Sequence, residues 1–187
     1  MIESYLVKHC APTLASLKTA GLFTFSFNNE NDLDRQIAFC NELINSKGVY
    51  ITILKKKQNT ALIYVYRKNK LSMDMKQDGV FNFLQMYGYK STDVDYAIEK
   101  LKQRVNSSDV FPHEIGMFLG YPLSDVIGFI NNSGRNSKMT GYWKVYGDVA
   151  YAVNLFDKFN KCRRVYAKKY FDGTSIQKLT VGVTAKI

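Results

Sequence analysis

The chain has 187 residues, of which 46% are hydrophobic and 22% are charged, and its formal net charge is +10. The length fits a single domain over residues 1–187, and the composition excludes an intrinsically disordered chain. Its apolar runs are far shorter than the roughly 20 residues of a membrane helix, and charges interrupt residues 1–10, which excludes a signal peptide. We therefore expect a cytoplasmic protein without a membrane segment, whose positive charge favours an anionic partner.

The first half of the chain predicts helices, a lone strand and a hairpin. In chain order we expect an amphipathic stretch at 2–9, a helix at 12–20, a strand at 22–27, a helix that ends at Gly48, and strands at 49–54 and 61–66. Pro12 sets the start of the first helix, because Pro is favoured at the first helical position. Asn31 and Asp32 offer an N-cap for the second. The two later strands are nearly all apolar, which predicts an antiparallel hairpin of central strands covered on both faces.

The second half is richer in helices. We expect helices at 78–87, 92–105, 112–119 and 122–131, a polar loop at 131–140, a short strand at 142–146 and a long helix at 148–171. The tail at 174–187 has room for a further strand. Helices and strands do not alternate regularly enough for a doubly wound parallel sheet, so the predicted fold class is α+β. It would have a small antiparallel or mixed sheet of about four strands, packed with several helices that include one long C-terminal helix.

Three segments of the chain resemble a known bacterial family. They are HCAPTLASLK at 9–18, FPHEIGMFLGYP at 111–122 with DVIGF at 125–129, and GYWKVYGD at 141–148. Together they resemble the family catalogued as domain of unknown function 3793, and the resemblance spans almost the whole chain. It implies a cytoplasmic, single-domain bacterial protein, and it implies no activity.

The same three segments contain both histidines and a concentration of polar side chains, which predicts a shared cleft. Our leading hypothesis is that segments 9–18, 111–122 and 141–148 form a cleft that binds an anionic small molecule or cofactor, whose identity the sequence does not reveal. The polar loop would add Arg135, Lys138 and backbone amides. The leading contacts would be Cys10, Lys18, His113 and Lys144, and the further expected ligand contacts are His9, Glu114, Arg135, Lys138, Trp143, Tyr146 and Asp148.

A second hypothesis is a thiol enzyme. Cys10 would lie just ahead of the first predicted helix, where unpaired amides and the helix dipole stabilise a thiolate. His113 would act as the base, oriented by Glu114 or Asp148. The competing interpretation is that Cys10 is a small buried residue, as free cysteines often are.

A third hypothesis is nucleic-acid binding through the long basic helix. The residues that would contact the nucleic acid are Lys158, Lys161, Arg164 and Lys168. A helix-turn-helix is not favoured, because the helix at 122–130 contains Asp125 and no Lys or Arg to read base edges. The other basic clusters, at 55–57 and 67–70, should lie at opposite ends of the hairpin, so the positive charge is spread.

Metal binding is not expected from the sequence. Structural zinc sites use closely spaced Cys and His pairs, whereas this chain has three cysteines and two histidines without such spacing. Cys40 and Cys162 fall on the apolar stripes of predicted helices, so packing explains them. An odd number of distant cysteines also argues against a disulfide framework and favours a reducing compartment.

Overall fold

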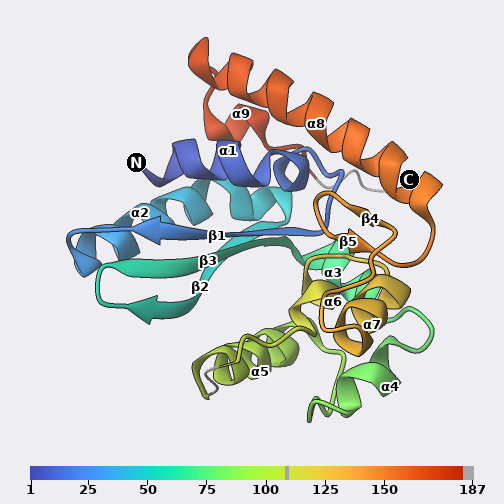
Figure 1. Ribbon diagram of the computed structural model, residues 1–187. Coiled ribbons are helices and arrows are strands. Elements are labelled where there is room, and N and C mark those ends of the chain that lie inside the picture. Colours follow the sequence, from blue (N-terminus) through green and yellow to red (C-terminus); the bar gives the residue numbers. More distant parts are fainter. Residues whose placement is uncertain (108–109, 183–187) are drawn as a thin grey trace.

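The protein, seen in a computed structural model that describes residues 1–107 and 110–182, has an α+β fold built on a three-stranded antiparallel sheet (Figure 1). The strands are β1 (Ala20–Ser26), β2 (Val49–Lys57) and β3 (Thr60–Arg67), with β4 (Met139–Thr140) and β5 (Lys144–Val145) in a separate ladder. The helices are α1 (Ile2–Leu14), α2 (Glu30–Ile44), the short 3-10 helix η1 (Asn45–Lys47), α3 (Lys68–Met75), α4 (Val80–Gln85), α5 (Val94–Ser107), α6 (Ile115–Phe118), α7 (Leu123–Asn131), α8 (Val149–Phe171) and α9 (Ile176–Leu179). The predicted fold class is confirmed, including the long C-terminal helix.

β3 is the middle strand of the sheet, because the strand order is β1-β3-β2. Successive β3 side chains point to opposite faces, so Ile63 and Val65 enter one core while Tyr64 and Tyr66 enter another. α1, α2 and α9 cover the first face, and α3 to α7 cover the second (Figure 1). The predicted hairpin is confirmed, but β2 is an edge strand rather than a central one. Its apolar side chains pack against α2 and α5 on the two faces.

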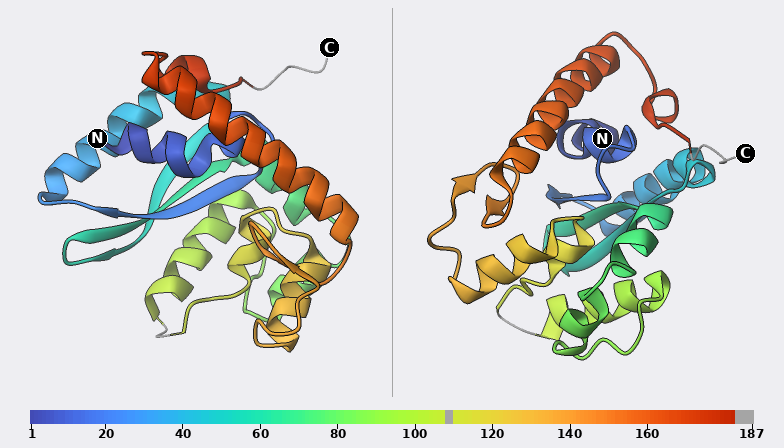
Figure 2. Two further views of the ribbon diagram at one scale, coloured as in Figure 1. Left: turned by 45° about the horizontal axis from the view of Figure 1, so that its top comes forward. Right: turned by 90° about the vertical axis from the view of Figure 1, so that its right-hand side faces the viewer.

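α1 lies between the sheet and α8, and this position explains its composition (Figure 2). Leu6, Val7 and Cys10 are all buried. The helix predicted at 12–20 is therefore wrong: α1 begins at Ile2, and Pro12 lies in its last turn. Proline inside a helix costs about 3 kcal/mol, because one hydrogen bond is lost and the ring clashes with the carbonyl of the preceding turn. Burying an apolar helix on two sides outweighs that cost.

Other predicted boundaries differ for local reasons. α2 begins at Glu30 because Asn29, rather than Asn31 or Asp32, is the N-cap, and its side chain accepts a hydrogen bond from the backbone N–H of Asp32. The predicted helices at 78–87 and 112–119 are shortened to α4 and α6, and α3 was not predicted. In contrast, α5, α7 and α8 confirm the helices predicted for their segments, and Gly48 ends η1 in the left-handed conformation.

The C-terminal third differs in its strands. The strand predicted at 142–146 is reduced to β5, which pairs only with β4. As a result the main sheet has three strands over residues 1–107 and 110–182, rather than the expected number of about four. The tail forms α9 instead of a further strand, and residues 183–187 lie outside the described ranges.

A buried arginine fixes the end of α1. The guanidinium of Arg67 is fully buried and donates hydrogen bonds to the carbonyl oxygens of Thr13 and Leu14, at 2.6 Å each. It also donates to the carbonyl oxygen of Val181 at 2.7 Å. Arg67, at the end of the middle strand, thereby holds the last turn of α1 and the C-terminal segment together, just before the α1–β1 turn.

Candidate functional site

The three segments singled out in the sequence meet at a cavity of about 430 Å³. The α1–β1 turn forms one part of its wall, the α6–α7 turn a second, the β5–α8 connection a third, and α3 a fourth. The lining residues on which the argument depends are Lys18, Thr19, Lys70, Asp74, Tyr121, Trp143 and Asp148. A cavity of this volume suits a small metabolite. Only the end of segment 9–18 takes part.

Lys18 places its ammonium group at the wall of this cavity, which we call the Lys18 cavity. Lys18 Nζ donates to the carbonyl oxygen of Ala20 at 2.7 Å and lies 5.1 Å from the centre of the Tyr121 ring. Burial lowers the pKa of Lys18 to about 8. Within the described ranges, no carboxylate oxygen lies within 4.0 Å of this nitrogen. Lys18 is therefore a half-buried cation that has no protein counterion among those residues.

Tyr121 and Trp143 form an aromatic wall, with ring centres 4.9 Å apart and an interplanar angle of 27°. The indole is oriented by a buried carboxylate, because Trp143 Nε1 donates to Asp125 Oδ2 at 2.7 Å. Asp125 Oδ1 also accepts hydrogen bonds from the backbone N–H groups of Tyr146 at 2.8 Å and Gly147 at 2.7 Å. Asp125 therefore fixes both the aromatic wall and the β5–α8 connection.

The carboxylates of the cavity already have protein donors. Asp74 Oδ2 accepts a hydrogen bond from the Thr19 hydroxyl at 2.5 Å, and burial raises the pKa of Asp74. Gly120, at φ +72°, passes so close to this pair that a Cβ would lie 2.6 Å from Thr19 Oγ1. Asp148 caps α8, since its Oδ1 accepts from a backbone N–H of the first turn at 2.9 Å. Lys18 and Lys70 are thus the lining cations that a ligand can still pair, since neither forms an ion pair within 4.0 Å among the described residues.

A second cavity, of about 410 Å³, shares the aromatic wall with the first. Apolar side chains such as Phe129 dominate its lining, and His113 and Lys144 are among its polar groups. The His113 ring meets Phe129 at 5.1 Å between ring centres, and Lys144 Nζ donates to a carbonyl oxygen of the polar loop. His113 and Lys144 were expected beside Lys18, and they line the neighbouring cavity instead.

Cys10 lines neither cavity and lies inside α1 rather than ahead of a helix. It is fully buried and packs so closely on Gly21 that a Cβ there would lie 2.6 Å from its Sγ. Burial raises the pKa of the Cys10 thiol to about 12, despite the charge of Lys18 nearby. The expected activation by a helix N-terminus is therefore wrong. Cys10 packs on the α1 face of the sheet, whereas His113 belongs to the α6–α7 side, so the expected thiol–base pair is not assembled.

Most of the remaining predicted contacts are engaged by other protein groups. Glu114 is fully buried and forms an ion pair with Arg104, so it faces the interior rather than a ligand. Tyr146 donates through its hydroxyl to the carbonyl oxygen of Arg135 at 2.8 Å, and the Arg135 side chain is exposed. Lys138 Nζ donates to a carbonyl oxygen of the β5–α8 connection at 3.0 Å. Arg135, Lys138 and Tyr146 belong to the contacts of the polar loop, and none of these residues, nor Glu114, lines the Lys18 cavity.

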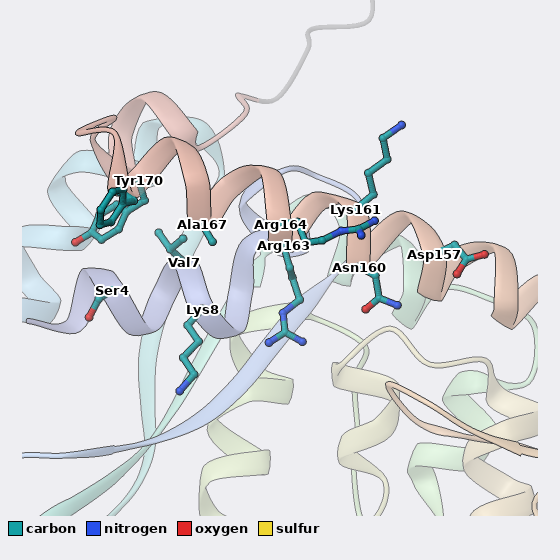
Figure 3. Close-up of a pocket in the computed structure, with 11 residues that line it drawn as sticks. Ser4, Val7, Lys8, Asp157, Asn160, Lys161, Arg163, Arg164, Ala167 and Tyr170 are labelled. Carbon is teal, nitrogen blue, oxygen red and sulfur yellow. The ribbon is translucent and has the colours of Figure 1, made fainter.

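Some of the basic residues of α8 line a different place, an open groove of about 1200 Å³ between α1 and α8 (Figure 3). The cations that line this groove are Lys8, Lys161, Arg163 and Arg164. Of the residues predicted to contact nucleic acid, Lys158 and Lys168 do not line it. His9, which adjoins Lys8 in α1, stacks on Phe23 at 5.4 Å between ring centres and does not line the Lys18 cavity.

Many residues of the Lys18 cavity were not predicted from the sequence, among them Thr19, Lys70, Asp74, Tyr121 and Asp125. Asp125 did give a signal, because a carboxylate in an otherwise apolar helix must find hydrogen-bond donors when it is buried. Thr19 and Asp74 gave none, since they are 55 residues apart in the chain and meet only through the fold.

This geometry defines an α+β protein with a cavity enclosed by the α1–β1 turn, α3, the α6–α7 turn and the β5–α8 region. The chain belongs to the family described as Protein of unknown function (DUF3793), whose pattern matches residues 6–180, and the resemblance drawn from the sequence is confirmed. No curated protein and no solved structure matches the chain. Over the described ranges, no helix has the length and apolar character needed to cross a membrane. In those ranges, no three His, Cys, Asp or Glu side chains gather in a way that could hold a metal ion.

Proposed function

We propose that the protein binds a small anionic molecule in the Lys18 cavity. The observation that supports this function most directly is the state of the Lys18 ammonium. It donates to one carbonyl oxygen and lies over an aromatic ring, with the thiol of Cys10 nearby, and no carboxylate lies within 4.0 Å of it in the described ranges. A cation removed from water without a counterion is unfavourable, and an anionic ligand would relieve that cost.

The other groups of the cavity support an anion over a cation. Asp74 and Asp148 accept hydrogen bonds from protein donors, so they are poorly placed to recruit a positive ligand. An ammonium has three N–H donors, and a ligand carboxylate or phosphate could take those that the carbonyl of Ala20 leaves. The Tyr121–Trp143 wall supplies an apolar surface for the rest of the ligand. The volume of about 430 Å³ favours a metabolite over a polymer.

The chain offers a built-in reporter for the test. Trp143 is the single tryptophan, and it lines the cavity, so its fluorescence should respond to a bound ligand. We would titrate the protein with inorganic phosphate, pyrophosphate, citrate and nucleoside phosphates. At least one of these anions should give a saturable change, and Lys18→Met should weaken its binding by about tenfold or more, as expected for a lost charge-assisted pair. Affinity should also fall as the pH rises above 8, because the anion pairs with the protonated amine, whose pKa is about 8.

A matched control separates this site from the general positive charge of the protein. Lys158→Met removes the same charge from the exposed face of α8 and should leave anion binding unchanged. Equal losses in Lys18→Met and Lys158→Met would contradict the proposal. So would full binding in Lys18→Met, or a wild-type protein that binds none of these anions.

A further inference from the structure

β1 leaves one edge of the main sheet open. Two hydrogen bonds at the ends of β1 show which of its backbone groups face β3. The Arg67 N–H donates to the Thr19 carbonyl oxygen, and the Phe27 N–H donates to the Asn59 carbonyl oxygen, both at 2.9 Å. Because hydrogen-bonded pairs alternate along antiparallel strands, the backbone groups of Leu22 and Thr24 point away from β3. Among the described residues, none donates a hydrogen bond to these groups or accepts one from them.

The opposite edge of the sheet, on β2, is closed by side chains. Asn41 of α2 donates to the carbonyl oxygen of Ile51 at 2.9 Å and accepts from its N–H at 2.8 Å. Its side-chain amide therefore occupies the two backbone groups of Ile51 that a neighbouring strand would pair with. Asn106 of α5 donates to the carbonyl oxygen of Leu54 at 2.8 Å. β2 also has a bulge and three lysines, whereas β1 (AGLFTFS) has neither charges, proline nor a register shift. Edge strands usually have such protection, so the bare edge of β1 is suited to another strand.

The space beside this edge is basic. His9 of α1 stacks on Phe23 of β1, with ring centres 5.4 Å apart. Lys8 and Arg163 point from α1 and α8 toward the β1 side of the groove (Figure 3). The pKa of His9 is lowered mainly by burial and further by the charges of Lys8 and Arg163, which is consistent with both cations being near this ring. A chain lying along β1 would therefore run past two cations.

We propose that β1 binds an extended acidic segment of a partner protein, which adds to the sheet as a further strand. Its backbone would pair with Leu22 and Thr24, and carboxylates at alternate positions would face Lys8 and Arg163, because every second side chain of a strand points to the same face. The strand edge distinguishes this partner from a nucleic acid, which would use the cations but has no peptide groups to pair with β1. This surface is separate from the Lys18 cavity, and the inference does not depend on the proposed function.

The test uses a fluorescein-labelled synthetic peptide in which Glu alternates with Val, and it measures binding by fluorescence anisotropy. The full-length protein should bind this peptide. Thr24→Pro should weaken binding about tenfold or more, and it removes no bond to β3, because the N–H of Thr24 points outward. The double variant Lys8→Glu/Arg163→Glu should lose the acidic peptide and bind a matched peptide in which Lys alternates with Val.

Controls on both partners keep the test decisive. Lys158→Glu/Lys168→Glu makes the same change in charge on α8 outside the groove, and it should change affinity by less than about twofold, as for screened distant charges. A Glu–Val peptide that is N-methylated at alternate residues cannot donate from the edge that would pair with β1. It should lose binding to the unaltered protein, and this result does not depend on whether Thr24→Pro folds well. Binding that survives both Thr24→Pro and N-methylation overturns strand addition. So does preferential binding of a uridine oligonucleotide that is insensitive to Thr24→Pro, or self-association that Thr24→Pro blocks in a protein that binds no peptide.

Discussion

Replacing Asp125 by Asn should destabilise the protein strongly while leaving the volume of the side chain unchanged. Asp125 is 3% exposed and accepts hydrogen bonds from Trp143 Nε1 and from the backbone N–H groups of Tyr146 and Gly147. An amide has only one oxygen. Whichever way it turns, its NH₂ group must face at least one of these N–H donors.

The magnitude follows from the number of bonds. Hydrogen bonds to a charged group contribute roughly 1.5–3 kcal/mol each, and a buried donor left unpaired costs a further 1–3 kcal/mol, approximately. If Asn keeps the two backbone bonds and loses the one to Trp143, the free energy of unfolding should fall by about 3 kcal/mol. Asp125→Ala, which removes all three bonds, should cost more.

The assay is urea unfolding followed through the fluorescence of Trp143, the single tryptophan of the chain. The exposed Asp157 of α8 provides the matched control, and Asp157→Asn should change the free energy of unfolding by less than about 0.5 kcal/mol. Trp143→Phe removes the fluorophore, so its unfolding is followed by far-UV circular dichroism, in both backgrounds. In the Asp125→Asn background it should cost less than in the wild type, because it removes the clashing indole N–H. A loss below about 1 kcal/mol for Asp125→Asn, with an unchanged fluorescence spectrum, would refute the role given to this carboxylate.

Three further outcomes are expected. Arg67→Met should lower the free energy of unfolding by about 3 kcal/mol in a denaturant titration, because it removes the hydrogen bonds that a buried guanidinium donates to the carbonyl oxygens of Thr13, Leu14 and Val181; a change below about 1 kcal/mol would contradict this. Maleimide should label the three buried cysteines only on unfolding, since burial raises the pKa values of Cys10 and Cys40 to about 12 and of Cys162 to about 11; rapid native labelling of Cys10, read by mass spectrometry, would argue the opposite. The folded protein releases the Lys18 proton near pH 8, whereas the unfolded chain keeps it to about 10.5, so this group should make the free energy of unfolding rise with pH between these values. Urea titrations across that window should show the rise in the wild type and a smaller one in Lys18→Met; identical slopes would count against the burial of this amine.

Elements with a strong local pattern could be predicted from the sequence. The hairpin of β2 and β3 follows from two apolar runs, and α8 follows from an apolar stripe that begins after the N-cap Asp148. Gly48 ends its helical segment because glycine adopts the left-handed conformation without strain. The resemblance of segments 9–18, 111–122 and 141–148 to one family also directed attention to parts of the chain that meet at a cavity.

The chemistry of each candidate residue was decided by tertiary structure. Cys10 follows the pattern of an activated thiol only if a helix begins at Pro12, and burial of α1 between the sheet and α8 extends the helix through that proline. Lys18 has an ordinary sequence context, and its pKa is lowered because the folded protein buries its side chain. Thr19 and Asp74 make a hydrogen bond across 55 residues that no local pattern records. Sequence periodicity reports which faces are apolar, whereas pKa values and counterions depend on what the fold places within a few ångströms of each group.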